Sequence, residues 1–380
     1  MSLFTRRLEL FRAFGIPIRL DLSWFVVFLL VTWSLATRAF PTLVPGLSPV
    51  LAWSMGAAGA LGLFASVLLH ELGHAVTAQR LGVRMRGITL FLFGGVAEMA
   101  EEPRTPKVEF LVAIAGPVVS VALALAGGGA ALLGRAAGWP APVVAVVGYL
   151  GLINGVLVAF NLIPAFPLDG GRVLRSALWA WKGSLRQATR ISSAIGSAFG
   201  FALIAWGVWQ VLQGEIFGGV WSFLIGMFLR NAARMSYQQL LLRRALEGEP
   251  VERFMHPDPV TVPRQISVQE LVDDYVYRHH FKFYPVVDEA GRLTGCITTR
   301  RIKELPREEW QRQTVGAIAD RCDAENTVPA GTDAVRALSR MSRTGASRLL
   351  VVDGDRLLGI LSLKDLLKFF AVKMELEEGK

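Results

Sequence analysis

The hydrophobic and polar positions divide the chain into two unlike parts. In the first part, long apolar runs alternate with short segments rich in arginine. At about 1.5 Å per residue, each of these runs can cross the hydrocarbon layer of a bilayer as a helix. We predict six spans, at residues 22–39, 50–78, 108–133, 143–168, 191–212 and 216–229. After them, charged residues become frequent and the apolar runs shorten, which indicates a soluble region.

The basic residues predict how the spans are oriented. Arginine and lysine precede the first span and follow the even-numbered spans, whereas the opposite loops contain only Arg38 and Arg135. Because cytoplasmic loops carry an excess of these residues, both termini are expected in the cytoplasm, with the chain crossing the cell's inner (plasma) membrane. The same rule accounts for the net charge of +9, so no nucleic-acid partner is expected.

The composition agrees with a membrane protein that has a soluble part. Hydrophobic residues make up 52% of the chain and charged residues 19%, which is below the share of about a quarter in soluble domains. The two cysteines, Cys296 and Cys322, are too few for a thiolate zinc site or a disulfide framework. They indicate a reducing compartment for the part that holds them.

The second span ends in a candidate metal site, the sequence HELGH at residues 70–74. His70 and His74 lie on one face of a helix and can bind the same ion, while Glu71 can act on a metal-bound water. Ionisable residues in a membrane span are costly unless they have a function. The sequence therefore predicts a zinc site in the cytoplasmic half of this span.

A mononuclear catalytic zinc needs a third protein ligand. The other three histidines all follow the last span, so we expect a carboxylate, and Asp169 is the candidate. It ends the fourth predicted span in the sequence NLIPAFPLDGG, residues 161–171, where two prolines break the helix and two glycines let the backbone turn inward. The alternative is that Asp169 only caps a helix at the membrane interface.

These two motifs together resemble the site-2 protease family of intramembrane metalloproteases. The resemblance covers about residues 1–235. It implies a zinc ion held by His70, His74 and Asp169, with Glu71 as the general base. It also implies that Asn161 hydrogen-bonds the substrate or the developing oxyanion. In such chemistry the metal polarises the scissile carbonyl, and the glutamate carries a proton to the leaving amine.

Two further segments are similar to that family. Residues 87–98, rich in β-forming residues around a glycine pair, predict a β-hairpin that dips into the cytoplasmic leaflet. An unwound substrate could add to its edge as a strand, which would supply partners for its backbone groups. An ordinary cytoplasmic hairpin is the alternative. Gly116-Pro117, in the third span, is expected to serve packing and bending.

The soluble region contains an internal repeat of about 60 residues. Its two copies follow the order helix, strand, turn, strand, helix, which resembles a tandem pair of CBS domains. Such pairs commonly bind adenine nucleotides in the cleft between the repeats. The matching segments are residues 261–263 with 327–329, 284–288 with 349–353, and 295–298 with 359–362.

The CBS resemblance implies candidate nucleotide-binding residues. Ser362 and Asp365 match the hydroxyl and the aspartate that meet a ligand's ribose. In the first repeat Thr298 matches the hydroxyl, but Arg301 stands where the aspartate would be and could meet phosphate instead. ATP, ADP or AMP is the expected ligand. A pair that binds no ligand and serves dimerisation or partner docking is the alternative, with a second copy of the chain as partner.

The predicted fold class is a polytopic α-helical membrane protein, with six transmembrane helices and a membrane-dipping β-hairpin, followed by an α/β tandem CBS domain pair. The expected boundaries are a protease domain at 1–235, a helix-prone linker at 236–249, CBS repeats at 250–310 and 311–373, and a tail at 374–380. The short loops leave no room for a PDZ-like insert. This favours the CBS-bearing branch of the family, which includes sporulation proteases that act on membrane-tethered pro-proteins.

The expected function is zinc-dependent cleavage of a transmembrane or membrane-tethered protein near the cytoplasmic leaflet, with the CBS pair as a regulator. One alternative is a CBS-regulated membrane transporter of metal or other ions. Such a transporter would need ligands but no general base at Glu71. A second alternative is a catalytically silent scaffold that only binds its client proteins.

Overall fold

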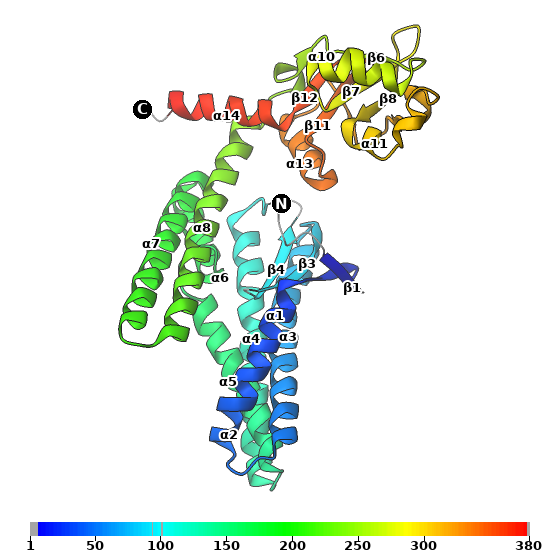
Figure 1. The fold of residues 1–380 in the computed structure, drawn as a ribbon. Coiled ribbons are helices and arrows are strands. Elements are labelled where there is room, and N and C mark those ends of the chain that lie inside the picture. Colours follow the sequence, from blue (N-terminus) through cyan, green and yellow to red (C-terminus); the bar gives the residue numbers. More distant parts are fainter. Residues whose placement is uncertain (1–6, 93, 100–101, 378–380) are drawn as a thin grey trace. The chain divides into compact units, whose positions relative to one another are not determined.

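The computed structural model describes residues 7–92, 94–99 and 102–377 (Figure 1). The chain splits into two compact units, Met1–Gln238 and Gln239–Lys380. In the described part of the chain, the first unit contains the apolar helices and one β-sheet, and the second contains two further sheets with short helices. Each unit is described by itself.

Among the described residues, six helical segments are long and apolar enough to cross a membrane, and each corresponds to one predicted span. The first, Ser23–Leu43, consists of α1 (Ser23–Ser34), a π-helical turn (Leu35–Ala39) and α2 (Phe40–Leu43). The others are α3 (Pro49–Arg80), α4 (Pro106–Ala136), α5 (Ala141–Asn161), α7 (Leu185–Leu212) and α8 (Ile216–Leu246).

The two helices that matter most for the site begin with strong local signals. Ser48 caps α3 by accepting a hydrogen bond from the Leu51 N–H, at 3.3 Å. Thr105 caps α4 in the same way. In both helices the next residue is proline, whose fixed φ suits the first helical position and whose missing N–H costs nothing there.

The fourth span is shorter than the sequence suggested. Helix α5 ends at Asn161, not near residue 168, and Asp169 begins a new helix, α6 (Asp169–Lys182). The interruption follows from Pro164 and Pro167, because a proline lacks the N–H of a helical hydrogen bond and disfavours helix at the residue before it. Asp169 therefore lies at the N-terminus of a helix.

The sheet of the first unit has the strand order β1-β2-β3-β4. Its strands are β1 (Arg7–Ala13), β2 (Ile16–Asp21), β3 (Met85–Phe91) and β4 (Gly94–Met99). The expected hairpin is the antiparallel pair β3–β4, and β2 joins it in parallel. Strands β1 and β2 were not expected from the sequence.

The side chains of β2 hold the sheet against α3. Ile16, Ile18 and Leu20 alternate with less buried residues and are almost fully buried, which is the pattern of a half-buried strand. Ile16 and Leu20 pack in one cluster with Ala75 of α3, one residue beyond the HELGH sequence. The sheet is thereby fixed beside the candidate metal site.

The second unit has two sheets with matching topology, as the internal repeat predicted. In each, a short parallel strand precedes an antiparallel hairpin. The first sheet is β6-β7-β8-β9, with β6 (Val262–Pro263), β7 (Phe283–Val287), β8 (Leu293–Thr298) and β9 (Asp320–Arg321). The second is β10-β11-β12-β5, with β10 (Thr327–Pro329), β11 (Arg348–Asp353), β12 (Arg356–Ser362) and β5 (His256–Pro257).

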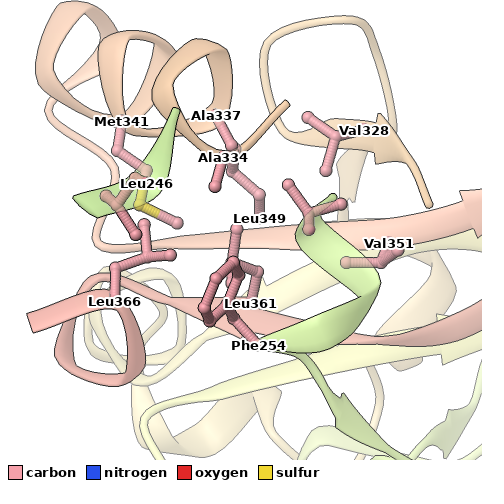
Figure 2. Packing of buried hydrophobic residues seen from close by; sticks show 11 residues of the cluster. Leu246, Phe254, Val328, Ala334, Ala337, Met341, Leu349, Val351, Leu361 and Leu366 are labelled. Carbon is pink, nitrogen blue, oxygen red and sulfur yellow. The ribbon is translucent and has the colours of Figure 1, made fainter. Parts of the chain in front are cut away.

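Helices cover these sheets and close two apolar cores. Figure 2 shows the core of the second repeat, in which Leu349 and Leu361 of the sheet meet Ala337 of α13 (Ala334–Thr344) and Leu366 of α14 (Leu363–Glu377). Leu246, the last residue of α8, is also fully buried in this core. The helix thus continues through most of the segment that was predicted to be a linker.

Candidate metal centre

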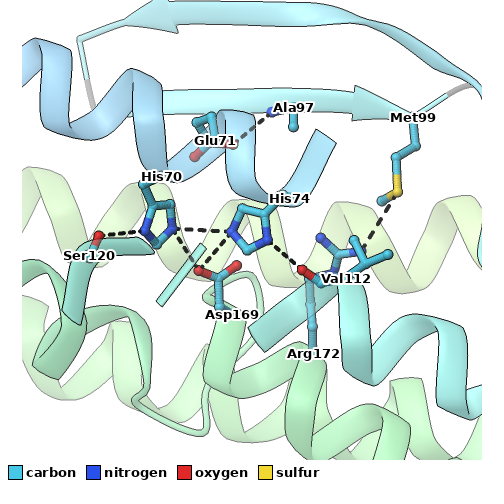
Figure 3. A network of polar contacts seen from close by, with 9 residues as sticks. All are labelled: His70, Glu71, His74, Ala97, Met99, Val112, Ser120, Asp169 and Arg172. Carbon is cyan, nitrogen blue, oxygen red and sulfur yellow. Dashed lines mark hydrogen bonds and ion pairs between the residues drawn. The ribbon is translucent and has the colours of Figure 1, made fainter. Parts of the chain in front are cut away.

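Helices α3 and α6 bring three candidate ligands together (Figure 3). His70 and His74 lie one turn apart on α3, and their Nε2 atoms are 3.2 Å from each other. Asp169 Oδ2, at the start of α6, lies 3.0 Å from His70 Nε2 and 3.1 Å from His74 Nε2. All three side chains are buried, so the cluster is shielded from bulk solvent in the structure.

Helix α4 orients the two imidazoles from the other side. The Nδ1–H of His74 donates to the Val112 carbonyl oxygen at 2.7 Å, and His70 Nδ1 is 2.9 Å from Ser120 Oγ. Such outer hydrogen bonds fix the rotation and the tautomer of a histidine ligand. They turn both Nε2 atoms toward Asp169.

Gly116 leaves the space that the imidazoles fill. A Cβ atom at this position would lie 2.7 Å from His70 Nε2 and still closer to His74 Nε2. Gly116 shares a face of α4 with Val112 and Ser120, because residues four apart are neighbours on a helix. Its part in the site is close packing, here against the two imidazoles, and packing is also what the sequence led us to expect of it.

The chemistry of the three donor atoms fits a cation. Because its Nδ1–H donates a hydrogen bond to the Val112 carbonyl, a neutral His74 carries no proton on Nε2, which has only a lone pair. That lone pair faces the carboxylate of Asp169. Two acceptors in contact repel each other unless a positive charge lies between them. Two imidazoles and one carboxylate form a ligand set of the kind used by catalytic zinc, which binds such atoms at about 2.0–2.2 Å.

The Glu71 side chain contacts strand β4 and is not one of the three candidate ligands. Its Oε2 accepts a hydrogen bond of 3.0 Å from the Ala97 N–H of β4. Gly95, on the same strand, has no side chain, and a Cβ there would lie 2.6 Å from Glu71 Cγ. Strand β4 therefore covers the glutamate closely, next to the histidines but outside the ligand cluster.

Asn161 is the last residue of α5 and is half-buried. Within the part of the chain that the structure describes, its side chain forms no hydrogen bond. The buried amide of this helix is Asn154, which donates to Ser66 Oγ at 2.9 Å and to the Leu150 carbonyl at 2.8 Å. Sequence reasoning missed Asn154 and Ser66, although an amide inside an uncharged span was a usable signal.

An ion pair buried beside the site was also missed. Arg175 of α6 donates through Nε to Glu109 Oε1 of α4 at 2.6 Å, and its Nη2 contacts the same oxygen. Glu109 is fully buried and Arg175 almost so. The Arg175 guanidinium also lies over the Phe166 ring, 5.1 Å from its centroid. The pair joins the helix that supports the histidines to the helix that carries Asp169.

The four candidate nucleotide residues lie where strands lead into helices. Thr298 caps α11 (Thr299–Lys303) by accepting the Arg301 N–H, and the Arg301 side chain donates to Glu304 at 2.8 Å. Ser362 Oγ donates to Asp365 Oδ2 at 2.5 Å. The other oxygen of Asp365 lies 3.1 Å from His256 Nε2.

A cavity of about 350 Å³ in the second unit lies elsewhere and includes none of these four residues. Its lining is Leu293, Thr294, Arg321, Cys322, Thr327, Val352, Gly354 and Asp355. Both repeats contribute to it.

Comparison with known proteins shows to which family the chain belongs. The model of peptidase family M50 matches residues 58–135 and 130–203, and the CBS domain model matches residues 251–308 and 322–372. A Mycobacterium tuberculosis protein named as zinc metalloprotease Rip3 is 36% identical over 362 residues, 95% of this chain and 92% of that protein. A zinc metalloprotease of Methanocaldococcus jannaschii is 32% identical over 376 residues, 98% of either chain. The chain belongs to peptidase family M50, the site-2 proteases.

A solved structure titled as the site-2 protease from Methanocaldococcus jannaschii is 30% identical, with a TM-score of 0.43 over 60% of this chain and 94% of that chain. The family, the enzyme class and the fold class predicted from the sequence are confirmed. The chain is a multi-pass, site-2 protease-like zinc metalloendopeptidase with a pair of CBS domains.

Proposed function

We propose that this site-2 protease cleaves a transmembrane or membrane-tethered protein near the cytoplasmic leaflet, with one zinc ion held by His70, His74 and Asp169. The observation that carries the proposal is the buried contact of their Nε2 and Oδ2 atoms. Zinc bound there polarises a carbonyl and lowers the pKa of water. The hydrogen bonds from α4 hold both imidazoles in place.

Glu71 acts as the general base in this proposal. It follows His70 directly on α3, and its carboxylate is not among the ligand atoms, so it stays available to accept a proton. It takes the proton from the attacking water and transfers it to the leaving amine. The Ala97 N–H supports the position of this carboxylate.

Asn161 is proposed to donate a hydrogen bond to the oxyanion that forms on the scissile carbonyl. It ends α5, and the turn that follows leads directly to Asp169, so both residues lie on the same connection. Its amide has no other hydrogen-bond partner within the described residues. A donor at such a position stabilises the transition state more than the substrate.

Strand β4 is proposed to bind the segment to be cleaved. Within the described residues it is the last strand of the sheet order and pairs with β3 alone, so its other edge has no partner strand there. A peptide bond inside a helix is shielded from attack, and an extended segment added to β4 would expose it while keeping its backbone groups paired. The closeness of β4 to Glu71 supports this role.

The arginine distribution supports an inner-membrane location with both termini in the cytoplasm. On this orientation the metal centre lies toward the cytoplasmic side. In the second unit we propose an adenine-nucleotide site at Ser362 and Asp365, with Thr298 and Arg301 at the matching place of the first repeat. Dimerisation through the CBS pair is proposed as the alternative use of this unit.

Reconstitution distinguishes the proposed protease from its alternatives. The purified protein is placed in liposomes with model single-span substrates, and product fragments and metal flux are both measured. Protease activity predicts a shortened fragment that requires zinc and Glu71. A transporter would move metal ions across the bilayer without any fragment, and a scaffold would retain the substrate uncut.

A further inference from the structure

The structure brings the two cysteines of the chain together in the second unit. Cys296 is buried in β8, and the half-buried Cys322 follows β9 directly. The two strands are antiparallel, with Cys296 opposite Asp320. Residues directly opposite each other point to one face of a sheet, as do residues two apart along a strand. Cys322 therefore leaves β9 on the same face as Cys296, as its diagonal neighbour.

The side chain of Asn326 forms hydrogen bonds with the chain segments of both cysteines. Its amide nitrogen donates to Cys296 Sγ at 3.8 Å and to the Arg321 carbonyl at 2.9 Å. Its Oδ1 accepts the Asp323 N–H at 2.8 Å. Asn326 thus contacts the sulfur of one cysteine and the backbone on either side of the other.

Cys322 is also accessible to a small reagent, because it lines the cavity of about 350 Å³ in this unit. The remaining wall includes Thr327 and Asp355, which belong to the second repeat. We propose that Cys296 and Cys322 form a reversible disulfide on exposure to a hydroperoxide, which makes this cavity wall an oxidation-sensitive site. This role is independent of the proposed protease mechanism.

The chemistry proceeds in two balanced steps. With hydrogen peroxide, the Cys322 thiolate attacks one oxygen and the O–O bond breaks, so that the sulfenic acid forms and hydroxide leaves. The hydroxide takes up the proton released by the thiol and becomes water. Cys296 then attacks the Cys322 sulfur, the S–S bond forms, and a second water leaves. Two electrons pass from the sulfurs to the peroxide. The hydrogen bond from Cys296 lowers the pKa of Cys322, which favours Cys322 as the attacking group.

The disulfide would change the segment that connects the two repeats. It would join β8 covalently to residue 322 and draw that sulfur away from the cavity wall. Because residues 322–326 lead from β9 into β10, the link would restrain the chain between the two sheets. A thiol reductant would restore the open form. Disulfides of this kind in a reducing compartment are typically transient and sensory.

The test uses the full-length protein in detergent, treated with stoichiometric hydrogen peroxide and analysed by intact mass and thiol alkylation. We expect a loss of about 2 Da, corresponding to two hydrogen atoms, together with loss of both alkylation sites. Dithiothreitol should reverse both changes. Asn326→Ala should slow the reaction, because it removes the contact between the two cysteine segments.

Single variants check the assignment of roles. In Cys296→Ser, Cys322 should stop at the sulfenic acid and react with dimedone. In Cys322→Ser, the buried Cys296 should remain a thiol. Retention of both thiols in the peroxide-treated wild-type protein would overturn the proposal. A disulfide that links two chains, in place of one within a chain, would overturn it equally.

Discussion

Replacing Arg175 by methionine tests how the metal centre is held in place. Glu109 and Arg175 form the buried pair between α4 and α6. Helix α4 orients both histidines through Val112 and Ser120, and α6 begins with Asp169. If the pair sets the position of these helices, its loss should weaken zinc binding without removing a ligand.

The magnitude follows from the burial of the pair. Removing one partner from a buried ion pair typically costs about 3–5 kcal/mol, because the other charge is left without compensation. Glu109 is fully buried, and within the described residues its Oε2 already lacks a hydrogen-bond partner. Losing a group that hydrogen-bonds a metal ligand typically lowers metal affinity by about 10- to 100-fold, or about 1.4–2.8 kcal/mol, and this pair positions the helix that supplies such groups. We expect the zinc affinity of the Arg175→Met protein to decrease by an amount in that range.

Competition with a chromophoric chelator measures the zinc affinity of the purified variants, and thermal unfolding of the metal-free forms measures their stability. Glu109→Leu combined with Arg175→Leu should recover stability, because an apolar pair can replace a buried ion pair. Ser222→Ala is a matched control, since it removes a hydrogen bond to Gln210 between α7 and α8. Unchanged zinc affinity in a folded Arg175→Met protein would refute the positioning role.

Three further predictions concern the site and the second unit. Gly116→Ala should reduce zinc content measured by metal analysis, because its Cβ would occupy the space of the imidazole nitrogens, and normal content would contradict that geometry. Asn161→Ala should lower the cleavage rate by about 10²- to 10³-fold with zinc content retained, and an unchanged rate would exclude an oxyanion role. Asp365→Ala should blunt any effect of ATP, ADP or AMP on cleavage. Calorimetry that detects no nucleotide binding to the folded wild-type protein would instead leave the CBS pair as a docking or dimerisation device.

The candidate site residues that could be predicted from the sequence are those that stand in short, recognisable motifs. His70 and His74 stand in a short motif, and Asp169 stands in a proline-interrupted segment beside a glycine pair, so all three could be named as candidate ligands before the structure placed their donor atoms together. Strand β2 was not predicted, because its pairing with β3 joins segments far apart in the chain. Its alternation of buried Ile16, Ile18 and Leu20 was nevertheless a readable signal.

The polar contacts were missed for the same reason, because they too join segments that are far apart in the chain. Glu109 and Arg175 are unremarkable in the sequence, since each follows the start of its own helix and neither belongs to the two motifs. Only the packing of α4 against α6 makes them a pair. Asn154 and Ser66 likewise meet only because α5 packs against α3. The pattern of residues within one helix does not show which residues of another helix that helix will contact.

The most direct test of the central claim compares Glu71→Gln with Asp169→Ala, measuring zinc content and substrate cleavage on the same purified samples. We expect Glu71→Gln to keep its zinc and lose cleavage, because it removes the proton carrier and leaves all three ligands. Asp169→Ala should lose both. Full zinc occupancy with normal cleavage in Asp169→Ala, or normal cleavage in Glu71→Gln, would contradict the proposed metal centre.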